Sequence, residues 1–451
     1  MKKLIAQHSV LVTQWCMRSY TETLNYIFNL RGGEIDLRLQ RVEQALALFD
    51  HPERRYRAFH IAGTNGKGST AAMLQRILSA GGYRAALYTS PHVVSFAERI
   101  RIGEQEISPQ EVVEITALIE DRLERAGIGL TFFEFVTVMA FVYFAWSGVD
   151  VAVVEVGLGG RLDATNLVLP QVSVITTIAK DHEAYLGSDT LSIAREKGGI
   201  IKERVPLVGG TLAAEVEELL RGIAQARGAA RFFLGKDFSL EVKDTERFDY
   251  RGLKWNLADL SLALRGRHQR SNAALALAAL EVAREAFPVS EAAVREGLRT
   301  VLWPGRFEVI SAQPRVILDG AHNGEGVNAL VSEIRHFQKG KKVRLLFAVM
   351  ADKDWPHMLG ELSTVAAEVV LTRAPMARSA DPNELASALA PQMPFRIIES
   401  PLEAAQFLLQ SARSDDTVLV AGSLYLLGEV RPWLLAQAGL ERATKTKPVE
   451  A

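Results

Sequence analysis

A glycine-rich octapeptide with one lysine is the segment of this sequence best suited to bind phosphate. It follows the apolar run 59–62 and reads Gly63-Thr64-Asn65-Gly66-Lys67-Gly68-Ser69-Thr70. Glycines let the backbone wrap closely around an anion, and the amides at a helix N-terminus point toward it. Lys67 would add a positive charge beside the β- and γ-phosphates of a nucleotide. Because Gly68 separates the lysine from the serine, the strict G-x-x-x-x-G-K-[ST] pattern is not met, and a glycine turn that only caps a helix is the alternative.

The elements around this octapeptide follow an α/β pattern. Residues 59–62 predict a strand that enters the loop, and residues 69–81 predict the helix that leaves it and ends at a glycine pair. Near-continuous apolar runs at 149–156 and 172–178 predict two further strands, buried on both faces of a parallel sheet. The N-terminal part is therefore expected to be a P-loop NTPase-like α/β domain with a parallel sheet.

A second α/β series follows a change of pattern in the middle of the chain. Residues 237–264 alternate polar and apolar, which predicts a short antiparallel excursion, and an alanine-rich helix follows at about 272–286. After the turn Trp303-Pro304-Gly305-Arg306, further strands are predicted at 315–318, 343–349, 368–372 and 417–422. These patterns predict one domain over 1–310, with an N-terminal extension and a terminal linker, and a smaller Rossmann-like α/β domain over 311–451.

The composition is that of an ordinary globular protein. The chain has 451 residues, of which 48% are hydrophobic and 23% charged, and its formal net charge is −1. Without a basic excess, a nucleic-acid partner is not expected. The longest charge-free apolar stretch, 135–148, is shorter than the roughly 18 residues of a membrane span, so no membrane partner is expected. The single cysteine, Cys16, excludes an intramolecular disulfide, and the absence of a signal-peptide cleavage site favours the cytoplasm.

Motifs spread over the chain resemble, in order, those of the folylpolyglutamate synthases of the Mur ligase superfamily. Beyond the octapeptide, the matching segments are Thr89-Ser90-Pro91-His92, Glu98-Arg99-Ile100-Arg101, Thr131-Phe132-Phe133-Glu134-Phe135, residues 155–166, Asp181-His182, residues 196–202, Gly266-Arg267-His268-Gln269 with Asn272, residues 304–308, and Asp319-Gly320-Ala321-His322-Asn323. The resemblance covers about residues 22–430. One departure is Gly198, where the family usually carries alanine.

This resemblance implies an ATP-dependent amide ligase that works with Mg²⁺. ATP would phosphorylate a carboxylate of a pteroate or folate, the amine of L-glutamate would attack the acyl phosphate, and the tetrahedral intermediate would collapse to an amide, ADP and phosphate. The implied partners are L-glutamate, reduced folates and dihydropteroate, since bacterial members are often bifunctional dihydrofolate and folylpolyglutamate synthases. K⁺ is a further cofactor to consider, and a monomer is expected.

Ser90 and Glu155 become ligands of the ATP-bound metal under this resemblance, and His182 becomes a ligand of a second metal. Magnesium prefers hard oxygen ligands, and Glu155 also stands at the carboxyl end of a predicted strand, where open α/β sheets bind their ligands. From residue types alone, Glu155 could instead pair with Arg161, Ser90 could cap a turn before Pro91, and a lone histidine is more often structural.

The resemblance assigns the rest of the nucleotide site to residues far apart in the sequence. Asn272 would contact adenine, Asp319 would hold the ribose, and His322 would lie near the phosphates. Arg306 would clamp a phosphate, with an interdomain salt bridge as its alternative role. Lys67, His182, Lys197 and His322 are the residues given roles in catalysis.

The expected site also includes residues that contact the pterin and one modified lysine. Phe133 is a candidate to stack on the pterin, with Asp163 and Ala164 nearby, although aromatic clusters usually belong to a core. The resemblance places a carbamylated lysine at Lys197, near the second metal. A plain ammonium there would be repelled by Mg²⁺, whereas a carbamate supplies oxygen ligands; the alternative is an ordinary cation paired with Glu196.

Two other functions fit parts of this sequence. Another Mur-type ligase could add an amino acid to a cell-wall nucleotide precursor, but the Lys67-Gly68-Ser69 order and the Phe132-Phe133 pair favour the folate branch. A regulatory P-loop ATPase would hydrolyse or sense ATP without ligation, and would not need Asp319 and His322 on a second domain.

Overall fold

The computed structural model describes residues 18–30, 38–244 and 247–440, which form two compact units. The N-terminal unit contains the described residues up to Ser90 together with Ala97–Leu262 and Arg270–Val301. The C-terminal unit contains Pro91–Phe96, Ala263–Gln269 and the described residues from Leu302 onward. Cys16 and the polar tail after Leu440 lie outside the described residues, and the predicted boundary near residue 310 stays a prediction.

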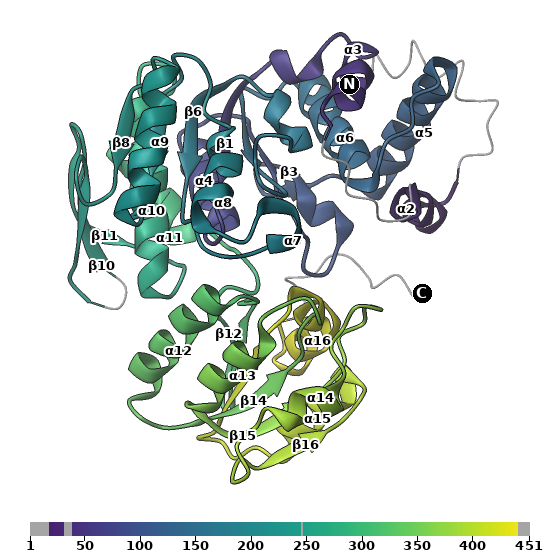
Figure 1. Cartoon of the computed structure of the whole chain (residues 1–451), viewed down its shortest axis with the longest axis vertical. Coiled ribbons are helices and arrows are strands. Elements are labelled where there is room, and N and C mark those ends of the chain that lie inside the picture. Colours follow the sequence, from purple (N-terminus) through teal and green to yellow (C-terminus); the bar gives the residue numbers. More distant parts are fainter. Residues whose placement is uncertain (1–17, 31–37, 245–246, 441–451) are drawn as a thin grey trace. The chain divides into compact units, whose positions relative to one another are not determined.

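The N-terminal unit is built on an eight-stranded sheet in the order β4-β3-β2-β5-β1-β6-β7-β8 (Figure 1). The strands are β1 Arg57–Ala62, β2 Ala85–Tyr88, β3 Ile100–Ile102, β4 Gln105–Glu106, β5 Val151–Glu155, β6 Pro170–Ile175, β7 Leu207–Gly209 and β8 Arg231–Phe233. All neighbours from β2 to β8 are parallel, and only β3 and β4 pair antiparallel. The predicted parallel-sheet domain is confirmed.

Helices cover this sheet, and a small antiparallel sheet follows it in the chain (Figure 1). The helices are α2 Tyr20–Phe28, α3 Gln40–Ala47, α4 Lys67–Ala80, α5 Pro109–Ala126, α6 Phe132–Ser147, α7 Glu183–Leu186, α8 Thr190–Gly198, α9 Ala214–Ala226, α10 Arg267–Val282 and α11 Glu291–Thr300, with the 3₁₀ turns η2 Pro52–Arg54, η3 Phe96–Arg99 and η4 Ala164–Leu167. The strands β9 Ser239–Val242, β10 Arg247–Arg251 and β11 Asn256–Ser261 pair antiparallel, as the polar–apolar alternation predicts.

The register places the chemistry-bearing residues at one edge of the large sheet. Ile61 of β1 lies opposite Glu155 of β5 and Val174 of β6. Carboxyl ends of neighbouring parallel strands share one edge, so the loop after β1, the end of β5 and the segment after β6 are neighbours. Strand β6 ends at Ile175, three residues earlier than predicted, and Thr176, Thr177 and Ala179 after it form hydrogen bonds with the loop after β1.

Helix α6 is the apolar stretch whose length argued against a membrane span, and it is a buried core helix. Its N-cap Thr131 forms a capping box with Glu134, and Arg41 donates to both carboxylate oxygens of Glu134 at 2.9 Å. Over the described ranges, no helix is both long enough and apolar enough to cross a membrane. The capping box and the buried ion pair fix the first turn of α6, which carries Phe133.

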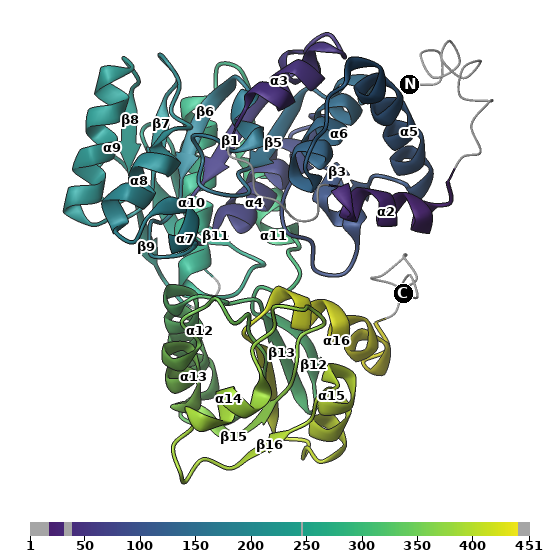
Figure 2. The same ribbon diagram turned by 45° about the vertical axis from the view of Figure 1, so that its right-hand side comes forward.

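The C-terminal unit is a six-stranded sheet with helices on both faces (Figure 2). Its order is β12-β13-β17-β14-β15-β16, and only β12 is antiparallel. The elements are β12 Glu308–Ala312, β13 Arg315–Asp319, α12 Gly324–Gln338, β14 Val343–Phe347, α13 Trp355–Ser363, β15 Ala366–Leu371, α14 Pro382–Ser387, β16 Phe395–Ile397, α15 Pro401–Gln410, β17 Thr417–Ala421 and α16 Leu424–Gln437. Alternate strand residues enter separate cores: Ile317 packs with α12 and α13, and Leu318 packs with α15 and α16. The predicted Rossmann-like fold is confirmed.

Helix α10 begins at Arg267, five residues earlier than predicted, and one of its side chains organises the turn between β10 and β11. Its buried Glu281 accepts hydrogen bonds from the Tyr250 hydroxyl at 2.7 Å and from the amides of Leu253, Lys254 and Trp255 at 3.0, 2.6 and 2.5 Å. One carboxylate thus accepts hydrogen bonds from three backbone amides of the turn between β10 and β11.

We expect Glu281→Leu to lower the free energy of local opening of residues 250–255 by about 3 kcal/mol, because three partly buried amides lose hydrogen bonds worth about 1 kcal/mol each. Native-state hydrogen exchange of these amides measures that free energy. The control is Tyr250→Phe, which removes one hydrogen bond and should cost only about 1 kcal/mol. Unchanged exchange protection in Glu281→Leu would contradict this account.

Candidate active site

The glycine-rich octapeptide connects β1 to α4 at the carboxyl edge of the sheet, as predicted. Gly66 is the N-cap of α4 with φ +85°, and no side chain caps the helix there. Lys67, Gly68, Ser69 and Thr70 form its first turn, where backbone amides have no intrahelical acceptor. An uncapped helix N-terminus of this kind is an anion-binding element.

Three successive carbonyl groups of this loop accept hydrogen bonds from side chains. Lys197 Nζ donates to the Gly63 carbonyl at 2.9 Å, and Lys67 Nζ donates to the Thr64 carbonyl at 3.1 Å. The Asn65 carbonyl accepts from the Thr176 hydroxyl at 2.6 Å. The loop carbonyls are therefore held by protein side chains, and their negative ends are compensated before any anion binds.

The segment after β6 holds the other side of the same loop. The Thr64 amide donates to the Thr177 carbonyl at 2.8 Å, and the Asn65 amide donates to the Thr177 hydroxyl at 3.0 Å. The Thr64 hydroxyl donates to the Ala179 carbonyl at 3.1 Å. Thr176 and Thr177 were missed in the sequence analysis, where they counted only as strand residues.

Close packing explains two of the loop glycines. A Cβ at Gly63 would lie 1.9 Å from the Thr176 hydroxyl oxygen, and a Cβ at Gly66 would lie 2.3 Å from Asn272 Oδ1. Asn272 is buried on α10 and thus stands against the N-cap of α4. The structure brings this predicted nucleotide residue to the loop from more than 200 residues away in the sequence.

Lys197 is a buried lysine whose partner is the loop itself. Its side chain lies at the end of α8, and burial, followed by the charge of Lys67, lowers its pKa to about 7, against the opposing influence of Asp181 and Asp163. Its expected alternative partner is engaged elsewhere, since Glu196 pairs with Arg161 at 2.8 Å. A lysine with this pKa holds a large fraction of neutral amine at neutral pH.

Glu155 and Ser90 lie together at the same edge of the sheet. Glu155 is the buried last residue of β5, and its Oε2 accepts from the Ser90 amide at 3.1 Å. The alternative pairing of Glu155 with Arg161 is wrong, because the Arg161 guanidinium donates to Glu196. Two oxygen-bearing side chains suit Mg²⁺, which usually keeps several waters and takes few protein ligands.

His182 does not fall within a metal-binding cluster. It is the N-cap of the one-turn helix α7, with φ +54°, and its amide donates to Asp181 Oδ1 at 2.9 Å. The one-turn helix α7 therefore follows it directly. In the part of the chain that the structure covers, no three His, Cys, Asp or Glu side chains gather as a metal site. Its role as a second metal ligand stays a prediction.

Phe133 rests on a glycine. A Cβ at Gly157 would lie 2.3 Å from Phe133 Cζ, and the Phe133 ring is 6.3 Å from the Tyr88 ring, centroid to centroid. Gly157 and Tyr88 were not singled out from the sequence, because neither residue type signals a binding site. The two aromatic rings and the glycine beneath Phe133 therefore lie together next to the end of β5.

Asp163 and Ala164 stand where the loop after β5 meets η4. Asp163 is the N-cap of η4 and accepts from the Leu158 amide at 2.8 Å and from the Thr165 amide and hydroxyl at 3.0 and 2.5 Å. Both carboxylate oxygens thus accept hydrogen bonds from the protein, and Ala164 is buried beside them. This arrangement favours an organising role for Asp163 in its loop.

The residues predicted on the C-terminal unit gather at the turn between β13 and α12. Asp319 Oδ2 accepts from the Phe307 amide and Oδ1 from the Ala321 amide, both at 2.8 Å. A Cβ at Gly320 would lie 2.3 Å from Arg306 Nη1, so the guanidinium covers that glycine.

His322 follows in the same turn, with Nδ1 2.7 Å from the Gly320 carbonyl. Because a carbonyl only accepts, Nδ1 carries a hydrogen, and in the neutral ring Nε2 is left as an acceptor. The predicted trio of Arg306, Asp319 and His322 therefore lies in one small region of this unit.

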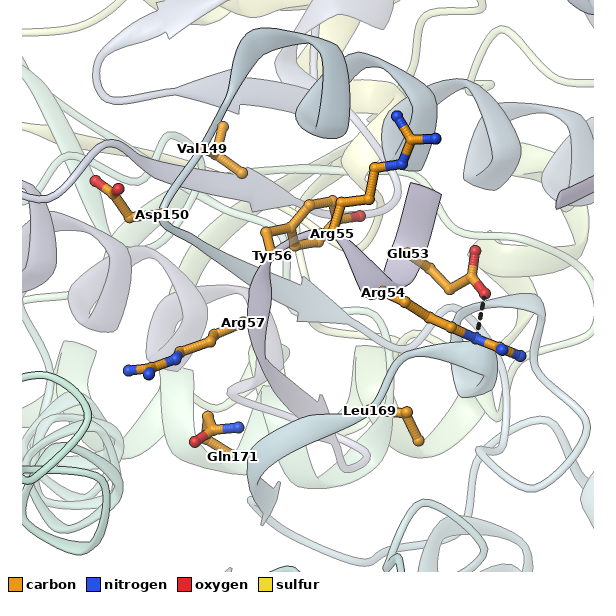
Figure 3. Close-up of a pocket in the computed structure, with 9 residues that line it drawn as sticks. All are labelled: Glu53, Arg54, Arg55, Tyr56, Arg57, Val149, Asp150, Leu169 and Gln171. Carbon is orange, nitrogen blue, oxygen red and sulfur yellow. Dashed lines mark ion pairs between the residues drawn. The ribbon is translucent and has the colours of Figure 1, made fainter. Parts of the chain in front are cut away.

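A pocket of about 510 Å³ lies at the opposite edge of the large sheet (Figure 3). It is lined by Glu53, Arg54, Arg55, Tyr56, Arg57, Val149, Asp150, Leu169 and Gln171, which stand at the amino ends of β1, β5 and β6. Its arginine side chains point in different directions (Figure 3). It contains none of the residues predicted for chemistry.

Comparison with known proteins finds two Mur ligase domains in this chain. Residues 61–280 match the Mur ligase middle domain, and residues 305–424 match the Mur ligase, glutamate ligase domain. The dihydrofolate synthase/folylpolyglutamate synthase of Bacillus subtilis (strain 168) is 36% identical over 414 residues, 87% of this chain and 94% of that protein.

Solved structures of similar proteins superpose over nearly the whole chain. Folylpolyglutamate synthase from Thermotoga maritima has a TM-score of 0.81 at 39% identity, over 93% of this chain and 97% of that chain. E. coli FolC in complex with DHPP and ADP has a TM-score of 0.87 at 35% identity, over 93% of this chain and 98% of that chain.

We expect Gly66→Ala to weaken ADP binding at least about tenfold, because the new Cβ would displace Asn272 and strain a residue with positive φ. The matched control is Gly82→Ala, with φ +90° and no atom within 4 Å of the added Cβ. It carries the same backbone strain and should leave ADP affinity unchanged. Isothermal titration calorimetry on both variants measures the difference, and equal ADP affinities would contradict the role of the Gly66–Asn272 contact.

Proposed function

This chain belongs to the folylpolyglutamate synthase and dihydrofolate synthase branch of the Mur ligase family, and we propose that its loop at 63–70 binds the ATP that activates a pterin-linked carboxylate. The product would be the amide of that carboxylate with L-glutamate, together with ADP and phosphate. The observation that carries the proposal is the phosphate loop itself, whose carbonyls at Gly63 and Thr64 are held by Lys197 and Lys67. The family that the sequence resembles is confirmed.

The reaction moves one phosphoryl group and forms one amide bond. A carboxylate oxygen of the folate or dihydropteroate attacks the γ-phosphorus, and the bond to ADP breaks. The neutral amine of glutamate then attacks the acyl carbon, and the tetrahedral intermediate expels phosphate while the nitrogen loses a proton. Both anionic reactants approach each other in the first step, so positive groups must surround the transferred phosphoryl group.

The chain's own residues supply part of that positive field. Lys67 lies on the loop and is free to exchange its contact with the Thr64 carbonyl for a phosphate oxygen, which makes a stronger, charge-assisted hydrogen bond. The first-turn amides of α4 add dipoles aimed at the same anion. Glu155 and Ser90 would hold Mg²⁺. When bound, the ion neutralises phosphate charge.

Residues on the C-terminal unit are proposed to complete nucleotide recognition. Asp319 would accept from a ribose hydroxyl, Arg306 would contact a phosphate, and His322 would lie near the phosphates. Asn272 of the N-terminal unit would face the adenine. The support is that Arg306, Asp319 and His322 gather at one turn at the carboxyl end of β13.

The proposal includes four finer assignments. A monomer, a cytoplasmic location, the use of K⁺ and the boundary near residue 310 remain proposals. The boundary is supported by the family matches, because the Mur ligase middle domain ends at residue 280 and the glutamate ligase domain begins at residue 305.

Lys197 is proposed to carry a carbamate. Its neutral amine would attack CO₂, forming one N–C bond and releasing one proton, and the product is an anion with two oxygens. The lowered pKa supplies the neutral amine that reacts with CO₂. The carbamate oxygens would suit a magnesium ion.

Phosphate release from ATP tests the proposed function. We expect release only when glutamate and a pterin acid are both present, with either dihydropteroate or tetrahydrofolate as the acid. Phe133→Ala should raise the KM for dihydropteroate about fivefold or more, since a stacking face is worth about 1 kcal/mol.

Phe132→Ala is the matched control for this variant, because Phe132 stacks on Phe28 at 5.4 Å and not on Gly157. Release that is indifferent to both substrates would favour a regulatory ATPase. Release that needs a cell-wall nucleotide precursor would favour another Mur-type ligase, and activity with tetrahydrofolate alone would leave only the monofunctional assignment.

We expect ¹³C NMR of the protein in ¹³C-bicarbonate to show a carbamate signal that Lys197→Met abolishes. At fixed dissolved CO₂ the signal should grow as pH rises through about 7, because the neutral amine reacts and the ammonium does not. The control is Lys202→Met, which should leave the signal in place, since Lys202 also has a lowered pKa, of about 8, but its Nζ contacts the Asn166 carbonyl and not the loop at 63–70. A signal that survives Lys197→Met would end the carbamate proposal.

A further inference from the structure

His60 is a buried histidine on β1 that the proposed reaction does not use. It lies three residues before Gly63, is fully buried, and its Nε2 is 2.9 Å from the Thr165 hydroxyl oxygen. Its Nδ1 has no hydrogen-bond partner among the residues that the structure describes. Burial, followed by the charge of Lys202, lowers its pKa to about 3, so the ring is neutral at physiological pH.

The direction of the hydrogen bonds follows from the partners of Thr165. The Thr165 hydroxyl has one hydrogen, and its oxygen is 2.5 Å from Asp163 Oδ1. An ionised carboxylate only accepts, so the Thr165 hydrogen points to Asp163. The Thr165 oxygen must then accept from His60, which places the ring hydrogen on Nε2.

The opposite arrangement is disfavoured by the same atoms. A protonated Asp163 would donate to Thr165, which would in turn donate to Nε2 and leave the ring hydrogen on Nδ1. That hydrogen would be a buried donor without an acceptor, which costs more than a partnerless lone pair. Burial raises the pKa of Asp163, and the hydrogen bonds from Thr165 and Leu158 oppose that rise.

We propose that His60 is a positioning residue for the pterin end of the substrate, acting through Thr165 on Asp163. The inference rests on the proposed function, because it takes Phe133 as the pterin contact. With Asp163 held as a carboxylate, its Oδ2 binds the Leu158 amide at 2.8 Å and fixes the neighbouring Gly157. Phe133 lies directly on Gly157, so the chain of hydrogen bonds sets the position of its ring.

The nucleotide loop has separate supports. Gly63, Thr64 and Asn65 are held by Lys197, Lys67 and residues 176–179, none of which belongs to the chain from His60 to Asp163. Loss of His60 or Thr165 should therefore change the use of the pterin acid and leave ATP binding intact. A merely structural role would affect both substrates together.

Two matched pairs of variants test this. Thr165→Val and His60→Leu break the chain of hydrogen bonds, and we expect each to raise the KM for dihydropteroate about tenfold, with the KM for ATP within about twofold of wild type. Thr165→Ser keeps the hydroxyl and His60→Gln keeps a donor at the same reach, so both should restore most of the affinity.

Ser173→Ala is the control for a buried hydroxyl at the same depth of the sheet. Ser173 lies opposite His60 in the register and donates to the Ile200 carbonyl at 3.0 Å, outside the chain of hydrogen bonds. Its KM values should stay at the wild-type level. If His60→Leu fails to fold, the Thr165 pair decides the question alone.

An independent readout is the tautomer of His60. ¹⁵N NMR of histidine-labelled protein, assigned with His60→Gln, should show hydrogen on Nε2 and no titration between about pH 5 and pH 9. A ring with hydrogen on Nδ1, or one that titrates near neutral pH, would overturn the inference.

The outcomes separate the two proposals. If Phe133→Ala raises the KM for dihydropteroate while Thr165→Val does not, the positioning role of His60 is wrong and the proposed function stands. If neither variant changes that KM, the pterin assignment of Phe133 is wrong, and the inference is wrong with it. Equal effects of Thr165→Val on the KM for ATP and for dihydropteroate would also overturn it.

Discussion

The carbonyl groups of the loop at 63–70 are held by side chains from other elements, and the carboxyl edge of the large sheet is organised around these contacts. The carbonyls of Gly63, Thr64 and Asn65 each accept from a side chain, and those side chains come from α4, α8 and the end of β6. The ending of β6 at Ile175, the threonines that follow it and the burial of Lys197 are consequences of holding this loop. The large parallel sheet brings these elements to one edge.

Charge is the second organising factor, and it works at short range. Two lysines contact adjacent carbonyls of one loop, and burial lowers the pKa of the buried one, Lys197, to about 7. Asp163 and Asp181 act in the opposite direction on the same group. The charge of Lys197 therefore depends on the neighbouring charges of Lys67, Asp163 and Asp181, and a bound nucleotide and metal ion would add further charges to this set.

The sequence was sufficient for the features that depend on local pattern. The loop, its flanking strand and helix, the end of β5 at Glu155, the antiparallel excursion and the turn after Asp319 all lie where residue periodicity and glycine placement predict them. It was insufficient where contacts join distant segments. The hydrogen bond from Lys197 to Gly63 spans 134 positions, and that from His60 to Thr165 spans 105. Neighbouring residues in the sequence do not reveal the partner of a histidine inside an apolar strand, or that an aromatic ring packs on a particular glycine.

The short segment Pro91–Phe96 carries a consequence for the ancestry of such proteins. It belongs to the C-terminal unit although residues of the N-terminal unit flank it on both sides, and its Val93 packs into the core formed with α15 and α16. A Cβ at Gly428 would lie only 2.1 Å from the Val93 carbonyl oxygen, so α16 is shaped around this hexapeptide. A gene fusion that exchanged everything after residue 301 would separate α16 from Pro91–Phe96, the segment that it packs against. An exchange of the distal half between relatives should therefore preserve the core around Val93 only when the hexapeptide is exchanged with it.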